Sequence, residues 1–167
     1  MSTLHEAFVE TLKDTYDAEH QILKALPKVI KNVEDDDLRE ALESHLEETK
    51  EHVKRLEQVF GIFEESPKRK KCNGMAGLLT EGEEVMDEDE GESALILALQ
   101  KVEHYEIAAY GALVAWAKVL QEEKAVTILQ QTLGEEKNAD KKLNDIAGDV
   151  VDAEAEQDDE AEQRKAA

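Results

Sequence analysis

Hydrophobic residues recur every three or four positions in four long stretches of the chain, which is the spacing of amphipathic α-helices. The predicted helices cover about residues 3–33, 37–63, 93–121 and 124–150. The acidic segment "EDDD" at 34–37 separates the first two, and its aspartates can cap the second helix. Pro27 lies inside the first predicted helix and lacks a backbone N–H, so we expect a kink there.

A long connection separates the second and third predicted helices. It holds a short amphipathic segment, predicted to be helical at about 75–86, and then an acidic loop that contains glycine and ends near Ser93. Beyond residue 151, the sequence "DAEAEQDDEAEQRKAA" has no large apolar side chain. We therefore expect a folded domain over residues 1–150 and an acidic, disordered tail over residues 151–167.

The two halves of the sequence are similar to each other. Shifting the chain by 87 positions superposes Glu19 on Glu106, together with several leucines. The same shift carries the turn at 35–37 onto 122–124, where neither glycine nor proline marks a break. Two helical hairpins joined by a long crossover predict an all-α fold, an antiparallel four-helix bundle of ferritin-like connectivity with a short helix in the crossover.

The composition supports a helical protein without disulfides. Only 4% of the 167 residues are aromatic, and 41% are hydrophobic, which is enough for one core. The lone Cys72 has no partner for an internal disulfide, and no apolar stretch has the length of a signal-peptide core or a membrane span. We therefore expect a cytoplasmic protein with no membrane partner.

The chain is strongly acidic, with 41 Asp and Glu against 20 Lys and Arg and a net charge of −21. This charge argues against nucleic acid as a partner and favours cations. A solvated halophilic surface explains most of it. The basic run at 68–71 is the only positive cluster, and we expect it to be an exposed part of the crossover.

Some carboxylates fall where a helix should be apolar. At about 100° per residue, Glu19 and Glu106 lie at the centres of their apolar arcs and Glu136 lies close to the centre of its own. In an antiparallel hairpin, residues equidistant from the turn lie at the same height along the bundle. These three acids therefore lie in one layer with further acids at the edges of the apolar arcs. The predicted layer consists of Glu19, Glu48, Glu103, Glu106, Glu136 and Asp140. Buried like charges are costly unless they are protonated or bridged by cations, so the layer predicts two divalent ions, with histidine as a further ligand.

Four segments of the chain carry a family resemblance. They are "DTYDAEHQILKALPK", "HLEETKEHVKRLEQVF", "QKVEHYEIAAYG" and "EEKNADKKL". Together they resemble the YciE/YciF family of ferritin-like proteins over about residues 4–150. The resemblance implies a dinuclear iron or manganese carboxylate centre inside a four-helix bundle, a homodimer and a role in stress response.

The more distant rubrerythrin-type pattern guides the choice of ligands. Its glutamate pair on the third helix is matched by Glu103 and Glu106, and its ligand pair on the fourth by Glu136 and Asp140. The usual Glu-x-x-His of the second helix is absent, because the residue three positions after Glu48 is Glu51 and not a histidine. The predicted metal ligands are Glu19, His45, Glu48, Glu103, Glu106, Glu136 and Asp140.

Several alternatives to this ligand set remain open. His45 is preferred to His52 because it belongs to the family-like "HLEET", although either can be a hydrogen-bonded core residue. Glu135 is an alternative to Glu136 as a metal ligand. The internal repeat favours Glu135, whereas the position on the helix face favours Glu136. The acids themselves can be ion-paired residues at the edge of the core. Three tyrosines are candidates for hydrogen bonds to ligands or for packing in the core, namely Tyr16, Tyr105 and Tyr110.

These features together predict a ferritin-like protein with two iron ions, or manganese, as cofactors. We expect it to oxidise Fe²⁺ with O₂ or peroxide, as a ferroxidase or peroxide-reducing di-iron oxidoreductase in stress protection. We also expect a homodimer. The alternative is a non-enzymatic metal-binding or structural protein with the same bundle, and a third reading is an all-α scaffold without metal. Repeated turnover of Fe²⁺ distinguishes the first from the others.

Overall fold

The chain is entirely helical in the part that the structure describes. The computed structural model describes the backbone of residues 3–88 and 91–166 and the side chains of residues 3–88 and 91–151. Its five helices are α1 (Leu4–Asn32), α2 (Asp36–Ile62), α3 (Asn73–Asp87), α4 (Glu92–Val119) and α5 (Glu123–Ala166). No strand occurs within these described residues. The predicted all-α class is therefore confirmed.

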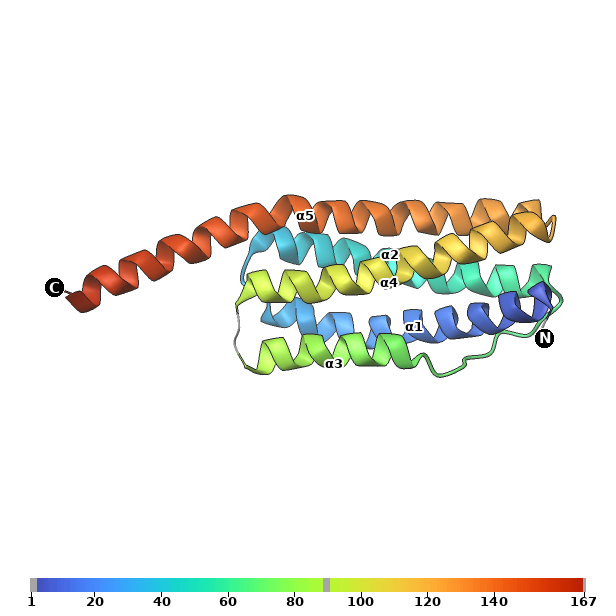
Figure 1. Cartoon of the computed structure of the whole chain (residues 1–167), viewed down its shortest axis with the longest axis horizontal. Helices are drawn as coiled ribbons and strands as arrows, with labels where there is room; N and C mark the ends of the chain where they lie inside the picture. Colours follow the sequence, from blue (N-terminus) through green and yellow to red (C-terminus); the bar gives the residue numbers. More distant parts are fainter. Residues whose placement is uncertain (1–2, 89–90, 167) are drawn as a thin grey trace.

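The four long helices lie side by side along the long axis of the molecule (Figure 1). α1 packs against α2 and α4, and α5 packs against the same two helices, so each long helix has two antiparallel neighbours. α2 and α4 run in the same direction, and the chain must therefore return along the whole length between them. It does so through the segment 63–72 and α3, which packs on the outside of α1 and α4.

Local sequence explains where the helices begin and end. Thr3 and Glu6 form a reciprocal capping box at the start of α1, and the Asp35 carboxylate accepts a hydrogen bond from Leu38 N at the start of α2. Glu64 and Gln121 adopt left-handed backbone conformations, with φ of 56° and 62°, just after α2 and α4. The break near 122–124, expected from the repeat alone, therefore occurs without a glycine.

The hydrophobic core is divided into two clusters by a polar layer. One cluster gathers around Phe8, Phe60 and Leu113, and the other around Ile22, Leu38 and Ile96. Polar side chains lie at or between these clusters on each long helix. The buried members of this layer are Thr15, Glu19, His45, Thr49, His52, Glu103, Glu106, Thr132 and Glu136. A layer of this kind must be stabilised by something other than apolar burial.

One helix boundary differs from expectation. α1 ends at Asn32 with Pro27 inside it, as predicted, whereas α5 continues to Ala166, beyond the predicted end at residue 150. The last stretch is rich in alanine, glutamate and glutamine, which favour helix even without an apolar face. The division into a domain over 1–150 and a disordered tail over 151–167 stays a prediction. Among the described residues, no helix is both long and apolar enough to cross a membrane.

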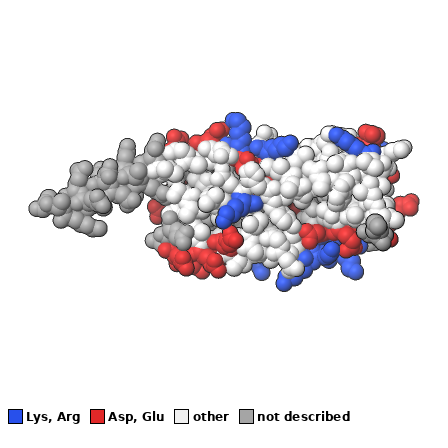
Figure 2. Space-filling model, viewed as in Figure 1, with Lys and Arg blue, Asp and Glu red and all other residues white. Residues whose placement is uncertain are grey.

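The surface charge is spread rather than concentrated. On the face shown in Figure 2, acidic groups occur at both ends of the described part, and basic groups lie between and beside them. The Arg69 guanidinium of the basic run binds the Asp17 carboxylate at 2.7 Å, and Lys70 Nζ lies 3.2 Å from Glu10 Oε2. These two members of the run therefore tie the crossover to α1.

Candidate metal centre

All four long helices place acidic or imidazole side chains in the polar layer. Helical geometry explains the selection, because His45 and His52 are seven residues apart and Glu103 and Glu106 three apart, so each pair shares one helix face. Each acid and histidine of the layer is at most 5% exposed. The layer's acids and histidines are Glu19 of α1, His45 and His52 of α2, Glu103 and Glu106 of α4, and Glu136 of α5.

The first group of potential ligands consists of His45, Glu103, Glu106 and Glu136. Each offers one ligand atom, and these atoms all lie within 4.8 Å of one another. His45 Nε2 is 3.3 Å from Glu103 Oε1 and 3.9 Å from Glu136 Oε2. A group of ligand atoms this close together could hold a metal ion.

The second group consists of Glu19, His52 and Glu136. His52 Nδ1 is 3.0 Å from Glu136 Oε1 and 3.4 Å from Glu19 Oε1. Glu136 thus belongs to both groups, and its two oxygens face different histidines. Glu136 could therefore help to hold an ion in either group.

Each histidine has a carboxylate on its outer side. His52 Nε2 lies 2.8 Å from Glu135 Oε2, and Arg55 holds Glu135 through both of its terminal nitrogens. His45 Nδ1 lies 3.7 Å from Glu48 Oε2. Carboxylates in this position orient metal-binding histidines and leave the other ring nitrogen facing the ion.

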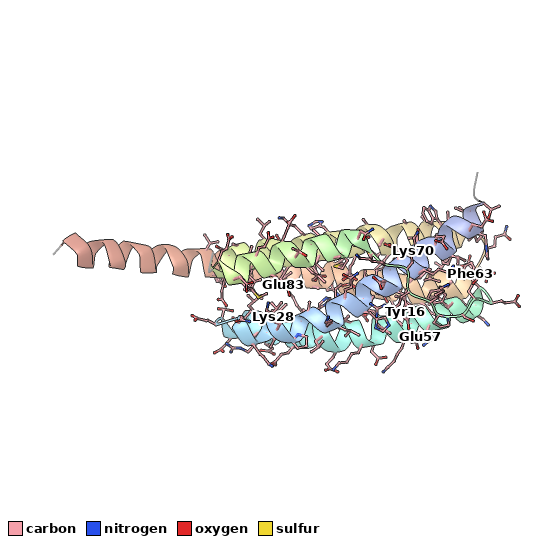
Figure 3. All side chains as sticks on the ribbon, turned by 90° about the horizontal axis from the view of Figure 1, so that it is seen from below. Tyr16, Lys28, Glu57, Phe63, Lys70 and Glu83 are labelled. Atoms are coloured by element: carbon pink, nitrogen blue, oxygen red, sulfur yellow. The ribbon has the colours of Figure 1, made fainter. Side chains whose placement is uncertain are left out.

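Only one of the three tyrosines contacts the layer. The Tyr110 hydroxyl donates a hydrogen bond to Glu19 Oε1, and burial together with nearby carboxylates raises the pKa of Tyr110, so it remains a donor. Tyr16 donates to Glu57 on the outer side of α1 and α2, where both are labelled in Figure 3. The Tyr105 hydroxyl donates to Asp14 and lies 2.9 Å from Cys72 Sγ.

Without a cation the layer is in electrostatic conflict. Burial raises the pKa of the Glu103 carboxyl to about 8; nearby His45 opposes the rise and Glu136 adds to it. Burial and then the neighbouring carboxylates raise the pKa of Glu106 well above its usual value. Burial alone would lower the pKa of His52, but Glu136 and Glu19 outweigh it and raise the pKa to about 11. The layer therefore retains protons at neutral pH.

Most polar atoms of the layer have no hydrogen-bond partner. Buried side chains are normally satisfied, and an unsatisfied buried group costs about 1–3 kcal/mol. The unpartnered atoms of the layer are Glu19 Oε2, both ring nitrogens of His45, His52 Nδ1, Glu103 Oε2, both oxygens of Glu106 and both oxygens of Glu136. Divalent cations would satisfy the members of the two groups at once.

The structure brings together five of the seven predicted ligands, namely Glu19, His45, Glu103, Glu106 and Glu136. The other two lie outside both groups. Glu48 is behind His45, and Asp140 lies beside the exposed His104, whose Nε2 is 3.3 Å from Asp140 Oδ1.

The structure also places His52, which the sequence favours less than His45, in a ligand group. The seven-residue spacing between the two histidines is the sequence signal that both face the same way. The repeat contains a second signal. It pairs Glu48 with Glu135, and each of these two acids lies behind a histidine.

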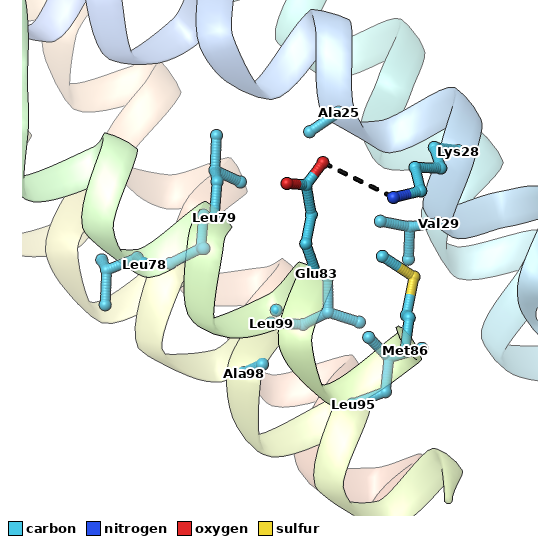
Figure 4. Close-up of a pocket in the computed structure, with 12 residues that line it drawn as sticks. Ala25, Lys28, Val29, Leu78, Leu79, Glu83, Met86, Leu95, Ala98 and Leu99 are labelled. Atoms are coloured by element: carbon cyan, nitrogen blue, oxygen red, sulfur yellow. Dashed lines mark ion pairs between the residues drawn. The ribbon is translucent and has the colours of Figure 1, made fainter. Parts of the chain in front are cut away.

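A different hollow lies between α1, α3 and α4, and its lining is mainly apolar (Figure 4). Leu79, Met86 and Leu99 line it, and the Lys28 Nζ to Glu83 Oε1 ion pair, 3.6 Å long, is among its residues. None of the layer's acids or histidines lines this hollow, and its one carboxylate among the described residues, Glu83, is ion-paired with Lys28.

Comparison with known proteins agrees with the resemblance seen in the sequence. Residues 3–156 match the family described as "Domain of unknown function (DUF892)". The chain is 43% identical to Protein YciF of Escherichia coli (strain K12) over 163 residues, covering 93% of this chain and 97% of that protein.

Two solved structures are similar over most of the chain. The crystal structure of the E. coli stress protein YciF matches with a TM-score of 0.87 and 42% identity, covering 91% of this chain and 99% of that one. YcfI from Rhodopseudomonas palustris, described as a proposed structural protein, matches with a TM-score of 0.83 and 41% identity, covering 86% and 94%. The chain therefore belongs to the DUF892 family and is similar to YciF over nearly its whole length.

Proposed function

We propose that this protein is a ferritin-like four-helix bundle that holds two metal ions, iron or alternatively manganese, and oxidises Fe²⁺ with O₂ or peroxide. The observation that supports the proposal is the pair of buried ligand groups that share Glu136 and contain unpartnered oxygen and nitrogen atoms. The description of E. coli YciF as a stress protein supports a role in stress protection.

The donor set fits divalent iron or manganese. Carboxylate oxygens and imidazole nitrogens are ligands that both ions accept, and no thiolate is among the donors. The two groups contain four carboxylates, which balance the charge of two divalent ions. The proposed ligands are Glu19, His45, His52, Glu103, Glu106 and Glu136.

The chain contributes orientation, proton storage and the exclusion of water. Glu135 and Arg55 fix the ring of His52, and Tyr110 fixes one oxygen of Glu19. Because Glu103 has a pKa of about 8, its carboxyl gives up a proton when it becomes a ligand. When bound, iron supplies the one-electron redox chemistry and the affinity for an oxidant.

A turnover experiment tests this proposal. The wild-type protein should consume many equivalents of Fe²⁺ with O₂ or peroxide, and Glu136→Gln should slow the oxidation by orders of magnitude because it removes the only side chain common to both groups. Glu43→Gln, an exposed change on α2, is the matched control.

If the wild-type protein stops after a stoichiometric amount of Fe²⁺, the oxidase proposal is wrong. The non-enzymatic metal-binding or structural role then stands instead, and the description of YcfI as a structural protein favours that alternative.

A further inference from the structure

The buried layer needs a route to solvent if cations are to reach it. Glu19, His52 and Glu136 have no exposed surface, whereas His45 and Glu103 keep 5% and 3%. His45 and Glu103 are also the members that line a small hollow between α2, α4 and α5, with a cavity volume of about 10 Å³, close to the space that one water molecule needs. The lining residues are Ala41, Leu42, His45, Glu48, Glu103, Ala139, Lys142 and Leu143.

A second hollow lies beside the first along α2 and α5, because Ala41 and Lys142 line both. The second hollow is the more open of the two. Its other lining residues are Asp37, Glu40, Ser44, Asp145 and Ile146. We call the two hollows together the α2–α5 groove.

The groove bears the chemistry of a path for cations. Asp37, Glu40 and Asp145 provide carboxylates at its outer end. Glu48 follows further in, with its side chain 35% exposed and its Oε2 3.7 Å from His45 Nδ1. At the inner end, both ring nitrogens of His45 and Glu103 Oε2 are buried without hydrogen-bond partners.

Lys142 is the one positively charged side chain among the described residues that line the groove. It is exposed, and it lines both hollows. Its charge acts on Glu48 across the groove. A fixed positive charge at this point opposes cations by Coulomb repulsion and offsets part of the attraction of the acids.

We propose that the α2–α5 groove is the port through which divalent cations reach the buried layer, and that Lys142 sets the rate of their passage. The inference rests on the proposed metal centre and adds its route of loading. The hollow between α1, α3 and α4 is a poor alternative, since Glu83 is the one carboxylate among the described residues that line it and is ion-paired with Lys28.

The test measures how fast Co²⁺ alone loads the metal-free, full-length chain, followed by stopped-flow absorbance in the absence of O₂. Lys142→Gln should speed loading and Lys142→Glu should speed it further, by about tenfold at low ionic strength. The gain should shrink as salt is added. Lys137→Gln and Lys137→Glu make the same changes in net charge at an exposed position of α5 outside the groove and should leave the rate near that of wild type.

A second variant tests the path by size instead of charge. Ala41→Leu fills the point where the two hollows adjoin and should slow loading without altering the final amount of bound Co²⁺. Equal loading rates for wild type and all Lys142 and Ala41 variants, with full final binding, would overturn the port and leave the metal centre intact. If wild-type protein takes up no Co²⁺ at all, the metal centre and the port both fail.

Discussion

Replacing Glu103 with glutamine should stabilise the metal-free protein and destabilise the metal-bound protein. In the metal-free protein the buried Glu103 carboxyl has a pKa of about 8, against an ordinary value of 4.5. Folding therefore forces the group to take up a proton at pH 7. At about 1.4 kcal/mol per pH unit, this uptake costs the folded state up to about 3 kcal/mol, which glutamine does not incur.

The sign of the effect depends on pH. Between pH 4.5 and 8 the folded state binds more protons at Glu103 than the unfolded state does, so the wild-type protein loses stability as pH rises through this range. The gain from Glu103→Gln should therefore be close to zero near pH 4.5 and largest at pH 8. For a chain of this size, 3 kcal/mol corresponds to a rise in Tm of about 6 to 12 °C.

Urea unfolding in the presence of a chelator measures the gain at several pH values, with Glu43→Gln as the exposed control on α2. Saturating Fe²⁺ or Mn²⁺ without O₂ should reverse the order of stability, since the variant has lost a charged ligand. A metal-free Glu103→Gln protein that is less stable than wild type at pH 7 would refute the reasoning. In that case Glu103 and His45 would form a net stabilising ion pair, and the layer would not require cations.

Two further predictions concern the ligands and the assembly. His52→Gln should lower the metal bound per chain from two ions to one, because His52 belongs only to the group with Glu19 and Glu136. The control His20→Gln on α1 should leave both ions bound. Elemental analysis measures the bound metal, and full occupancy of the His52→Gln variant would exclude His52 as a ligand. The protein should be a homodimer, because exposed apolar side chains such as Leu97 and Val119, 55% and 67% exposed, gain by burial across a two-fold axis. Light scattering checks the mass, and a monomer across a range of salt would count against it.

The sequence was sufficient for the helices and for most of the candidate site. Three-or-four spacing located the long helices, and the position of Glu19, Glu106 and Glu136 on their apolar arcs identified three acids that the structure buries. These predictions succeed because a helix face follows from the backbone alone. The long-range similarity between the two halves supplied the break after α4, which no local signal marked.

Residues at the edges of the arcs were harder to assign. Glu48, Glu103 and Asp140 all lie beside their arc centres, yet only Glu103 enters a ligand group. A small rotation of each helix decides whether such a side chain points inward, and packing against neighbours sets that rotation. The end of α5 was not predicted either. Helix propensity alone continues this helix beyond its apolar contacts, and the spacing of apolar residues does not report on that stretch.

The central claim is that the buried layer holds two metal ions, and metal content tests it most directly. Protein purified without chelator or metal-affinity tag, and then exposed to Fe²⁺ or Mn²⁺ without O₂ and dialysed, should retain two ions per chain by elemental analysis. Glu136→Gln should lose most of both, since Glu136 belongs to both ligand groups. Wild-type protein that retains no stoichiometric metal, or a Glu136→Gln variant that retains two ions, would contradict the account.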